Sequence, residues 1–347
     1  MTDGEPRWLI DPYADWARGE GVPVHAGLSV DLMKAETQPW PRLDARGAIV
    51  HIDGRGDFLD LHLVEIPPGG QTSPQRHVYE SVTYVLDGVG STTVQGPSGQ
   101  VSFEWARGSM FAIPLNAEYR HFNGSGRNPA RLAAVTNLPM VENLYRNDDF
   151  IFRNPASFAE RFGRKEFFEG SGTFIPTREH RHMWETNLIP NLLTFDRMQN
   201  SPSRGTGSTN IMFVLADATL HAHVSEIPVG RYKKAHRHSD GFHIFQLSGF
   251  GYSLYWDEGG EPERVDWSYG VVHGPAFFQW HQHFNVSDEP ARYMAIALGS
   301  IRYPFTSVSM RGWKATTERN EHQIEYEDED PEIRLVFDRE LAAARRS

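Results

Sequence analysis

The sequence predicts an all-β protein built from two copies of one barrel, and three observations lead to this prediction. The chain of 347 residues is long enough for two domains of ordinary size. Its first half recurs in its second half. Both halves consist of short runs rich in β-branched and aromatic residues, separated by Gly, Pro, Asn and Asp, which is typical of a sandwich or a closed barrel.

The repeat keeps nearly one spacing over a long stretch, because Gly69 and His77 recur 161 positions later as Gly230 and His238. Five short motifs share this relationship, which chance does not produce. The matching pairs are 65–69 and 226–230 (Glu-Ile-Pro-x-Gly), 76–77 and 237–238 (Arg-His), 88–90 and 249–251 (Gly-x-Gly), 121–123 and 283–285 (His-Phe-Asn), and 129–131 and 290–292 (Pro-Ala-Arg).

The elements follow from the local patterns. Runs such as Ser81–Leu86 and Phe242–Leu247 are predicted as strands, because β-branched and aromatic residues dominate them. Residues 145–170 are expected to be helical in part, and a second helix is predicted at Ile333–Ala344. The chain is thus divided into an N-terminal extension (1–50), a first barrel (51–140), a linker with a helix (141–208), a second barrel (209–305) and a tail with a helix (306–347).

Composition excludes several classes of protein. The absence of cysteine excludes disulfides, thiol nucleophiles and thiolate metal ligands. The formal net charge of −11 argues against a nucleic-acid partner. No run of about 18 apolar residues is present and the acidic N-terminus lacks the order of a signal peptide, so we expect no membrane span and a cytoplasmic location. Any metal must be held by nitrogen and oxygen ligands, which the 16 histidines can supply.

Three histidines of the second copy have the spacing of a metal site. Gly230 is followed after five residues by His236 and His238, and His281 lies on a later strand. Residues i and i+2 of a strand face the same side, so His236 and His238 can converge on one ion. His281 can then complete a facial set that leaves coordination positions open, as a catalytic metal requires.

This pattern resembles the cupin family. Its first motif is a glycine, five residues and His-x-His, followed by a glutamate, and its second includes a His and, four positions later, an Asn; these are His281 and Asn285 here. The resemblance covers roughly residues 55–137 and 215–300. It implies a jelly-roll barrel (a double-stranded β-helix) for each copy, and a metal bound by the three histidines in one barrel mouth.

The glutamate of the family pattern is absent. Seven residues before Gly249 stands Phe242, followed by His243. Either His243 is a fourth metal ligand, or the site has three histidines, as in gentisate dioxygenase-like cupins. Strand alternation places Phe242 and His243 on opposite faces, so the local backbone decides. His283 is a reserve ligand by resemblance to pirin-like cupins, although a packing role is favoured because His-Phe-Asn occurs in both copies.

The first copy has lost most of this site. Gln75 stands in place of His236 and Tyr119 in place of His281, whereas His77 persists. Because affinity requires several ligands held together, we expect the first barrel to be structural or to line a pocket of its own.

The resemblance implies an Fe(II)-dependent dioxygenase that acts on a small hydroxylated aromatic acid, with Mn, Ni or Zn as alternative metals. Two other functions stay open. One is a manganese enzyme like oxalate decarboxylase, which the missing glutamates disfavour. The other is a non-catalytic metal- or ligand-binding sensor.

The expected partner is therefore a small-molecule acid. Lys234 and Arg237 can attract its carboxylate, although solvated loop charges are the favoured interpretation of both residues. The resemblance to bicupins further suggests a homodimer.

Overall fold

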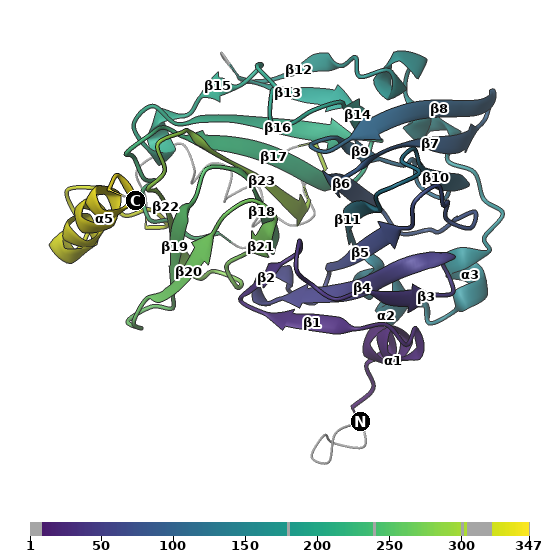
Figure 1. Cartoon of the computed structure of the whole chain (residues 1–347), viewed down its shortest axis with the longest axis horizontal. Coiled ribbons are helices and arrows are strands. Elements are labelled where there is room, and N and C mark those ends of the chain that lie inside the picture. The colour runs from purple at the N-terminus through teal and green to yellow at the C-terminus, as the bar shows by residue number, and fades with distance from the viewer. Residues whose placement is uncertain (1–8, 179–180, 239–240, 300–301, 304–320, 347) are drawn as a thin grey trace.

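Figure 1 shows two β-barrels side by side in a computed structural model of the chain, the first in purple and blue and the second in teal and green. The structure describes residues 9–178, 181–238, 241–299, 302–303 and 321–346. Each barrel consists of one large and one small sheet. The predicted all-β fold of two tandem barrels is confirmed.

The first barrel pairs an eight-stranded sheet with a three-stranded one. In spatial order the large sheet contains β1 (Val24–Gly27), β4 (Ala45–Ile52), β5 (Asp60–Ile66), β11 (Ala130–Thr136), β6 (Ser81–Asp87), β9 (Met110–Ala112) and β14 (Leu188–Ile189), with β3 (Gln38–Trp40) beside β4. The small sheet contains β10 (Tyr119–Asn123), β7 (Val89–Gly96) and β8 (Gly99–Ala106).

The second barrel repeats this plan with a nine-stranded and a three-stranded sheet. Its large sheet contains β12 (Thr173–Arg178), β13 (Arg181–Thr186), β16 (Thr209–Leu215), β17 (Leu220–Ile227), β23 (Ala291–Leu298), β18 (Phe242–Ser248), β21 (Val271–His273) and β2 (Ser29–Asp31), with β15 (Gln199–Asn200) beside β16. The small sheet contains β20 (Glu263–Trp267), β19 (Gly251–Trp256) and β22 (Trp280–Asn285).

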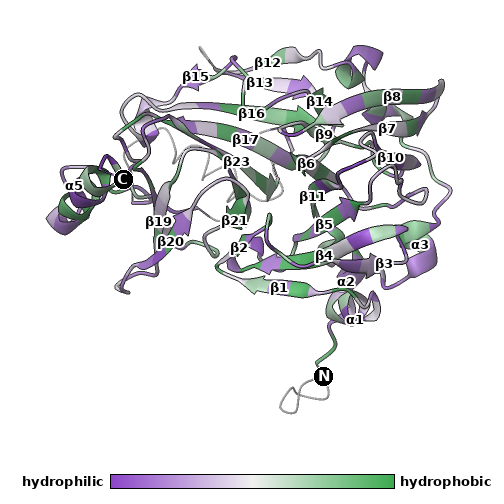
Figure 2. Cartoon of the chain, in the orientation of Figure 1, coloured by the Kyte–Doolittle hydropathy of each residue, from purple (hydrophilic) through white to green (hydrophobic). Residues whose placement is uncertain are grey.

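Among the described residues, the helices are short except at the C-terminus. They are α1 (Pro12–Gly19), α2 (Leu138–Tyr145), α3 (Asp148–Phe152) and α5 (Pro331–Ala344), with 3-10 turns η1 (Asp53–Arg55), η2 (Ala159–Phe162), η3 (Lys165–Phe168) and η4 (Pro202–Arg204). The predicted C-terminal helix is confirmed. Asp330 caps it by accepting from the N–H of Glu332, and Phe337 anchors its apolar side, while its other side is hydrophilic (Figure 2). In the described part of the chain, no helix is long and apolar enough to cross a membrane.

The two barrels share one hydrophobic core. Strand β6 turns Val82 and Tyr84 toward it, and β18 turns Phe245 and Leu247 toward it. The rings of Tyr84 and Phe245 lie 6.1 Å apart between centroids. Full burial of each such side chain stabilises the fold by roughly 1.5–3 kcal/mol. Because side chains alternate along a strand, the intervening residues of β6 and β18 face the inside of their own barrels.

Each barrel also receives a strand from a segment that the sequence analysis assigned to the N-terminal extension or the linker. β14 pairs with β9 of the first barrel, where Leu188 lies opposite Phe111. β2 pairs with β21 of the second barrel, where Val30 lies opposite Val272. Each of these segments thus reaches the barrel that is more distant along the chain, so the two barrels are joined through their sheets as well as through their core.

An arginine fixes the chain that follows β14. Arg292 on β23 donates to the carbonyls of Leu192 (2.6 Å), Leu193 (3.1 Å) and Phe195 (3.0 Å). Its guanidinium also pairs with Glu226 at 2.8 Å. One side chain thus satisfies three backbone acceptors and one carboxylate.

The first barrel has the same arrangement beside β2. Arg131 on β11 donates to the carbonyl of Leu32 (2.8 Å) and to that of Ala35, and pairs with Glu65 at 2.8 Å. Arg131 and Arg292 belong to the repeated Pro-Ala-Arg motif. This motif therefore serves the junction between the barrels.

Replacement of this arginine is expected to weaken the whole fold. Arg292→Met leaves three carbonyls and Glu226 without their donor, which predicts a loss of roughly 2–4 kcal/mol in the free energy of unfolding. Arg264→Met, which removes exposed pairs with Asp266 and Glu340, is the control and is expected to cost at most about 1 kcal/mol. Urea unfolding measures both. Equal, small losses would show that Arg292 does not hold the junction.

Candidate metal centre

The extended segment that carries His236 and His238 pairs with β22 only through isolated bridges at Tyr232 and His236. The N–H of Lys233 donates to the carbonyl of His283 (2.9 Å), and the N–H of His236 donates to that of His281 (3.0 Å). The segment advances by three residues, from Lys233 to His236, while β22 advances by two, from His283 to His281. Such an extra residue on one side of the pairing is a β-bulge. Beyond the bulge, His236 lies directly opposite His281, whose own N–H returns a bond of 2.9 Å.

Three of the four predicted ligands come together in the second barrel. One ring nitrogen from each of His236, His238 and His281 lies within 4.8 Å of the other two. The Nδ1 atom of His236 is 2.8 Å from the carbonyl of Lys234, and that of His281 is 3.1 Å from the carbonyl of Gln279. Because a carbonyl only accepts, Nδ1 carries the proton in both rings and Nε2 keeps a lone pair. This donor set fits a divalent transition-metal ion.

Burial keeps these rings in the form that binds metals. Removal from water, together with the nearby cations of Arg204 and Lys233, lowers the pKa of His281 to about 3. Burial likewise lowers the pKa of His236 well below its usual range. A neutral imidazole is a metal ligand and an imidazolium is not. Both rings are therefore ready to bind an ion at neutral pH.

Sequence reasoning missed two cations beside the triad. Lys233 is 3% exposed and its ammonium donates to the hydroxyl of Tyr293 (2.9 Å). Arg204 in η4 donates to the side-chain oxygen of Gln323 (3.2 Å). Burial lowers the pKa of Arg204 to about 10, so its guanidinium remains charged at neutral pH. Together the two residues place positive charge beside the triad.

The bulge explains why Lys233 was missed. Simple strand alternation from His236 places Lys234 and not Lys233 on the inward face, but the extra residue reverses the alternation and turns Lys233 inward. Lys234 forms a salt bridge with Glu325, and Arg237 forms one with Glu258. Both residues proposed from sequence to attract a carboxylate thus already have one within the chain.

Phe242 and His243 lie on opposite faces of β18. Phe242 faces the barrel interior, where its ring packs edge-on against His238 at 4.6 Å between centroids. His243 is fully buried on the face that carries Phe245 and Leu247 into the shared core. Among the described residues, neither of its ring nitrogens has a hydrogen-bond partner. The structure therefore does not bring His243 to the triad, and an aromatic ring stands at the position of the family's glutamate.

His283 is held by a chain of hydrogen bonds inside the barrel. Its Nδ1 is 2.7 Å from the hydroxyl of Ser253, which accepts from the indole N–H of Trp267 (2.9 Å). The first barrel has the same contact between His121 and Thr92 (2.7 Å). The favoured interpretation of His-Phe-Asn as a packing element fits this repetition.

Comparisons with known proteins agree with this fold. The Cupin domain family profile matches residues 62–136, in the first barrel. A structure of Bacillus subtilis oxalate decarboxylase, reported with Mn(II) centres, aligns with a TM-score of 0.51 at 14% identity, covering 78% of this chain and 77% of that chain. A point variant of that enzyme aligns with a TM-score of 0.51 at 13% identity, covering 80% and 78%. No curated protein matches the chain significantly.

These findings define the class of the fold, which is that of a bicupin. The family match covers the first barrel, whereas the three converging histidines lie in the second. At such low identity the structural likeness shows the fold alone. The chemistry must therefore be argued from the residues of the site.

His243→Leu is expected to keep the metal-binding capacity, because His243 lies outside the triad. It is also expected to raise the free energy of unfolding by roughly 1–2 kcal/mol, because it removes a buried imidazole with two unpaired nitrogens. His281→Leu, which removes one member of the triad, is the control and is expected to lose the ion. Metal content after Mn(II) loading and urea unfolding measure the two effects. Loss of the ion from His243→Leu would make His243 a ligand.

Buried histidines also predict a loss of stability in acid. Burial lowers the pKa of His77 to about 3 and that of His121 to about 4. Because their unfolded pKa is near 6.5, the unfolded chain takes up protons below about pH 6.5 that the folded chain refuses. The free energy of unfolding is then expected to fall by up to about 1.4 kcal/mol per pH unit for each histidine.

Urea unfolding across this pH range tests the expectation. The double variant His77→Gln/His121→Gln is expected to show a shallower fall than the wild type, because it lacks these two groups. Identical pH profiles for the two proteins would contradict the buried neutral state of these histidines.

Proposed function

We propose that the second barrel binds one divalent metal ion through His236, His238 and His281 and acts there on a small carboxylic acid. The observation that carries the proposal is the convergence of three imidazoles with two cations in one barrel. Packing alone does not explain this combination. Burial of a cation costs free energy unless the cation has a partner, and a bound anion would be such a partner.

The ligand set favours an anionic substrate. Three neutral imidazoles leave the charge of a divalent ion uncompensated, and Phe242 stands where the family pattern has a carboxylate. A bound ion supplies Lewis acidity that polarises a carboxylate oxygen. The carboxylate of a substrate would in turn supply the missing negative charge.

Lys233 and Arg204 would hold the remainder of that substrate. The ammonium of Lys233 has three N–H groups, of which one donates to Tyr293. The guanidinium of Arg204 presents a fork of donors suited to a carboxylate. Their charges favour a small dianion or a hydroxy acid over an uncharged molecule.

Two reactions fit such a site. Manganese-dependent decarboxylation is placed first, because the solved structures that are similar in fold include oxalate decarboxylase, one of them reported with Mn(II) centres. Oxygen-dependent cleavage with Fe(II), predicted from the sequence, is the second, because an all-histidine triad with Phe242 lacks the glutamate of the decarboxylase-like pattern. The comparisons themselves give no support to iron or to a dioxygenase.

Metal analysis and turnover test the proposal together. Protein reconstituted without oxygen with Mn(II) or Fe(II) is expected to retain about one equivalent of metal. Oxalate, malonate and hydroxybenzoates are then supplied while CO₂ release and O₂ uptake are followed. CO₂ release with Mn(II) and no net O₂ uptake supports decarboxylation, whereas O₂ uptake with Fe(II) supports a dioxygenase.

Matched variants assign the result to the second barrel. His236→Ala/His238→Ala is expected to lose metal and turnover, and His77→Ala, at the counterpart of His238, is expected to keep both. Arg204→Gln is expected to keep the metal and to raise KM for the acid at least about tenfold. A wild type without metal after reconstitution contradicts the proposal, and bound metal without turnover on any acid points to a binding protein instead.

A further inference from the structure

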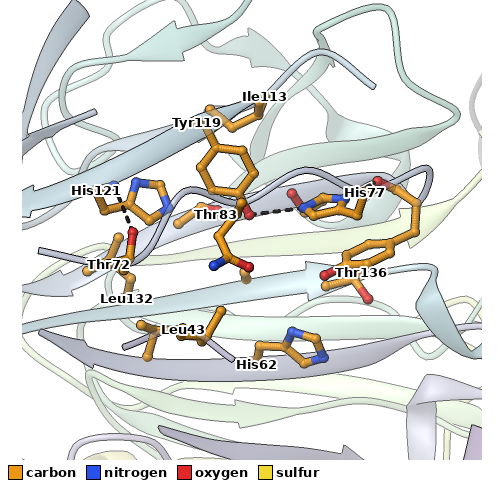
Figure 3. A pocket seen from close by; sticks show the side chains of 15 residues that line it. Leu43, His62, Thr72, His77, Thr83, Ile113, Tyr119, His121, Leu132 and Thr136 are labelled. Atoms are coloured by element: carbon orange, nitrogen blue, oxygen red, sulfur yellow. Dashed lines mark hydrogen bonds between the residues drawn. The ribbon is translucent and has the colours of Figure 1, made fainter. Parts of the chain in front are cut away.

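The first barrel encloses a cavity of its own (Figure 3). Its volume is about 40 Å³, which at roughly 10–15 Å³ for each water-sized group leaves room for a very small ligand. Its lining comes from both sheets, with His62 and Leu132 from the large sheet and Tyr119 and His121 from the small one. Figure 3 shows the hydroxyl of Tyr119 directed at His77.

The lining corresponds position by position to the candidate metal centre. In the first barrel, the N–H of Ser73 donates to the carbonyl of Leu43 (2.8 Å). In the second barrel, the N–H of Lys234 donates to the carbonyl of Arg204 in the same way (2.9 Å). Leu43 therefore occupies the place of Arg204. The second-barrel residues and their first-barrel counterparts are Arg204 and Leu43, Lys233 and Thr72, His236 and Gln75, Phe242 and Ser81, Ile244 and Thr83, and His281 and Tyr119. Two ring ligands and two cations are thus replaced by uncharged side chains.

No lysine or arginine among the described residues that line the cavity is available to receive an anion. None of the described lining residues is Lys, Arg, Asp or Glu. Burial lowers the pKa of His77 to about 3 and that of His121 to about 4, so both rings are neutral at neutral pH. The carboxylate of Asp60 lies 2.9 Å from Nε2 of His62. The second barrel has His221 at the position of Asp60. An anion in this cavity would therefore lie near the carboxylate of Asp60, with no lysine or arginine of the lining to receive it.

The polar part of the lining offers donors and acceptors. Nδ1 of His77 donates to the carbonyl of Tyr79 (2.8 Å), so its Nε2 accepts from the hydroxyl of Tyr119 (3.0 Å). The oxygen of Tyr119 can still accept a bond from a ligand. The hydroxyls of Ser81 and Thr83 can both donate and accept. The apolar part of the wall consists of Leu43, Val64, Ile113, Leu132 and Ala134.

We infer that the first barrel binds a small uncharged molecule that carries hydroxyl or amide groups on a compact apolar body. Its polar groups meet the hydroxyls and neutral imidazoles, and its body meets the aliphatic wall. Apolar lining with a few placed polar groups is the usual composition of such sites. A metal is not expected here, because among the described residues only His236, His238 and His281 form a group close enough to hold an ion.

Matched probes distinguish an uncharged ligand from an anion. Benzamide and benzoate share one shape, as do propane-1,2-diol and lactate, and each pair differs in charge. Binding is measured by saturation-transfer NMR at millimolar concentrations, on the wild type and on Ala134→Leu, whose larger side chain fills the cavity. At least one uncharged probe is expected to bind the wild type, and to bind Ala134→Leu at least about tenfold more weakly.

Ala295→Leu is the control, because Ala295 occupies the place of Ala134 in the second barrel. It is expected to keep the binding of the uncharged probe. If Ala134→Leu does not fold, Tyr119→Phe tests the same site, since it keeps the shape and removes one hydroxyl, and several-fold weaker binding is expected. The inference is overturned if no uncharged probe binds, if binding is unchanged in Ala134→Leu, or if filling the cavity weakens anion binding as much.

Discussion

The hydrophobic core between the two barrels determines which way the central strands face. β6 and β18 each place alternate residues in this core, including Tyr84 and Phe245, whose rings are 6.1 Å apart. Alternation then directs every intervening residue into its own barrel. Phe242 consequently faces the candidate metal centre and His243 faces the junction. The composition of the site thus follows from how the barrels pack against each other.

The molecule repeats its scaffold but not its chemistry. The arginine at the junction (Arg131 and Arg292) recurs with the same partners in both barrels, and so does the hydrogen bond that holds the buried histidine of the small sheet (His121 and His283). Six residues that line the first cavity differ from their second-barrel counterparts, and two of these counterparts are the cations Arg204 and Lys233. One frame therefore supports a cationic, histidine-rich site in the second barrel and an uncharged one in the first.

The sequence was sufficient for the fold and for three ligand candidates. The constant spacing of the repeat established two barrels, and the i, i+2 spacing of His236 and His238 placed both on one face. The role of His243 could not be decided, because the inward face of β18 depends on a contact with the other barrel. Lys233 and Arg204 were missed for similar reasons. A bulge reverses the alternation at Lys233, and Arg204 reaches the site from a distant turn whose place in the barrel only the folded chain shows.

The identity of the metal is not contained in the residues, since three imidazoles accept several divalent ions. The anomalous scattering of a crystal soaked in Mn(II) tests the central claim most directly, because it locates each bound ion. The account predicts one peak, between the ring nitrogens of His236, His238 and His281, and none in the first barrel. A peak in the first barrel, or no peak in the second, would contradict the account.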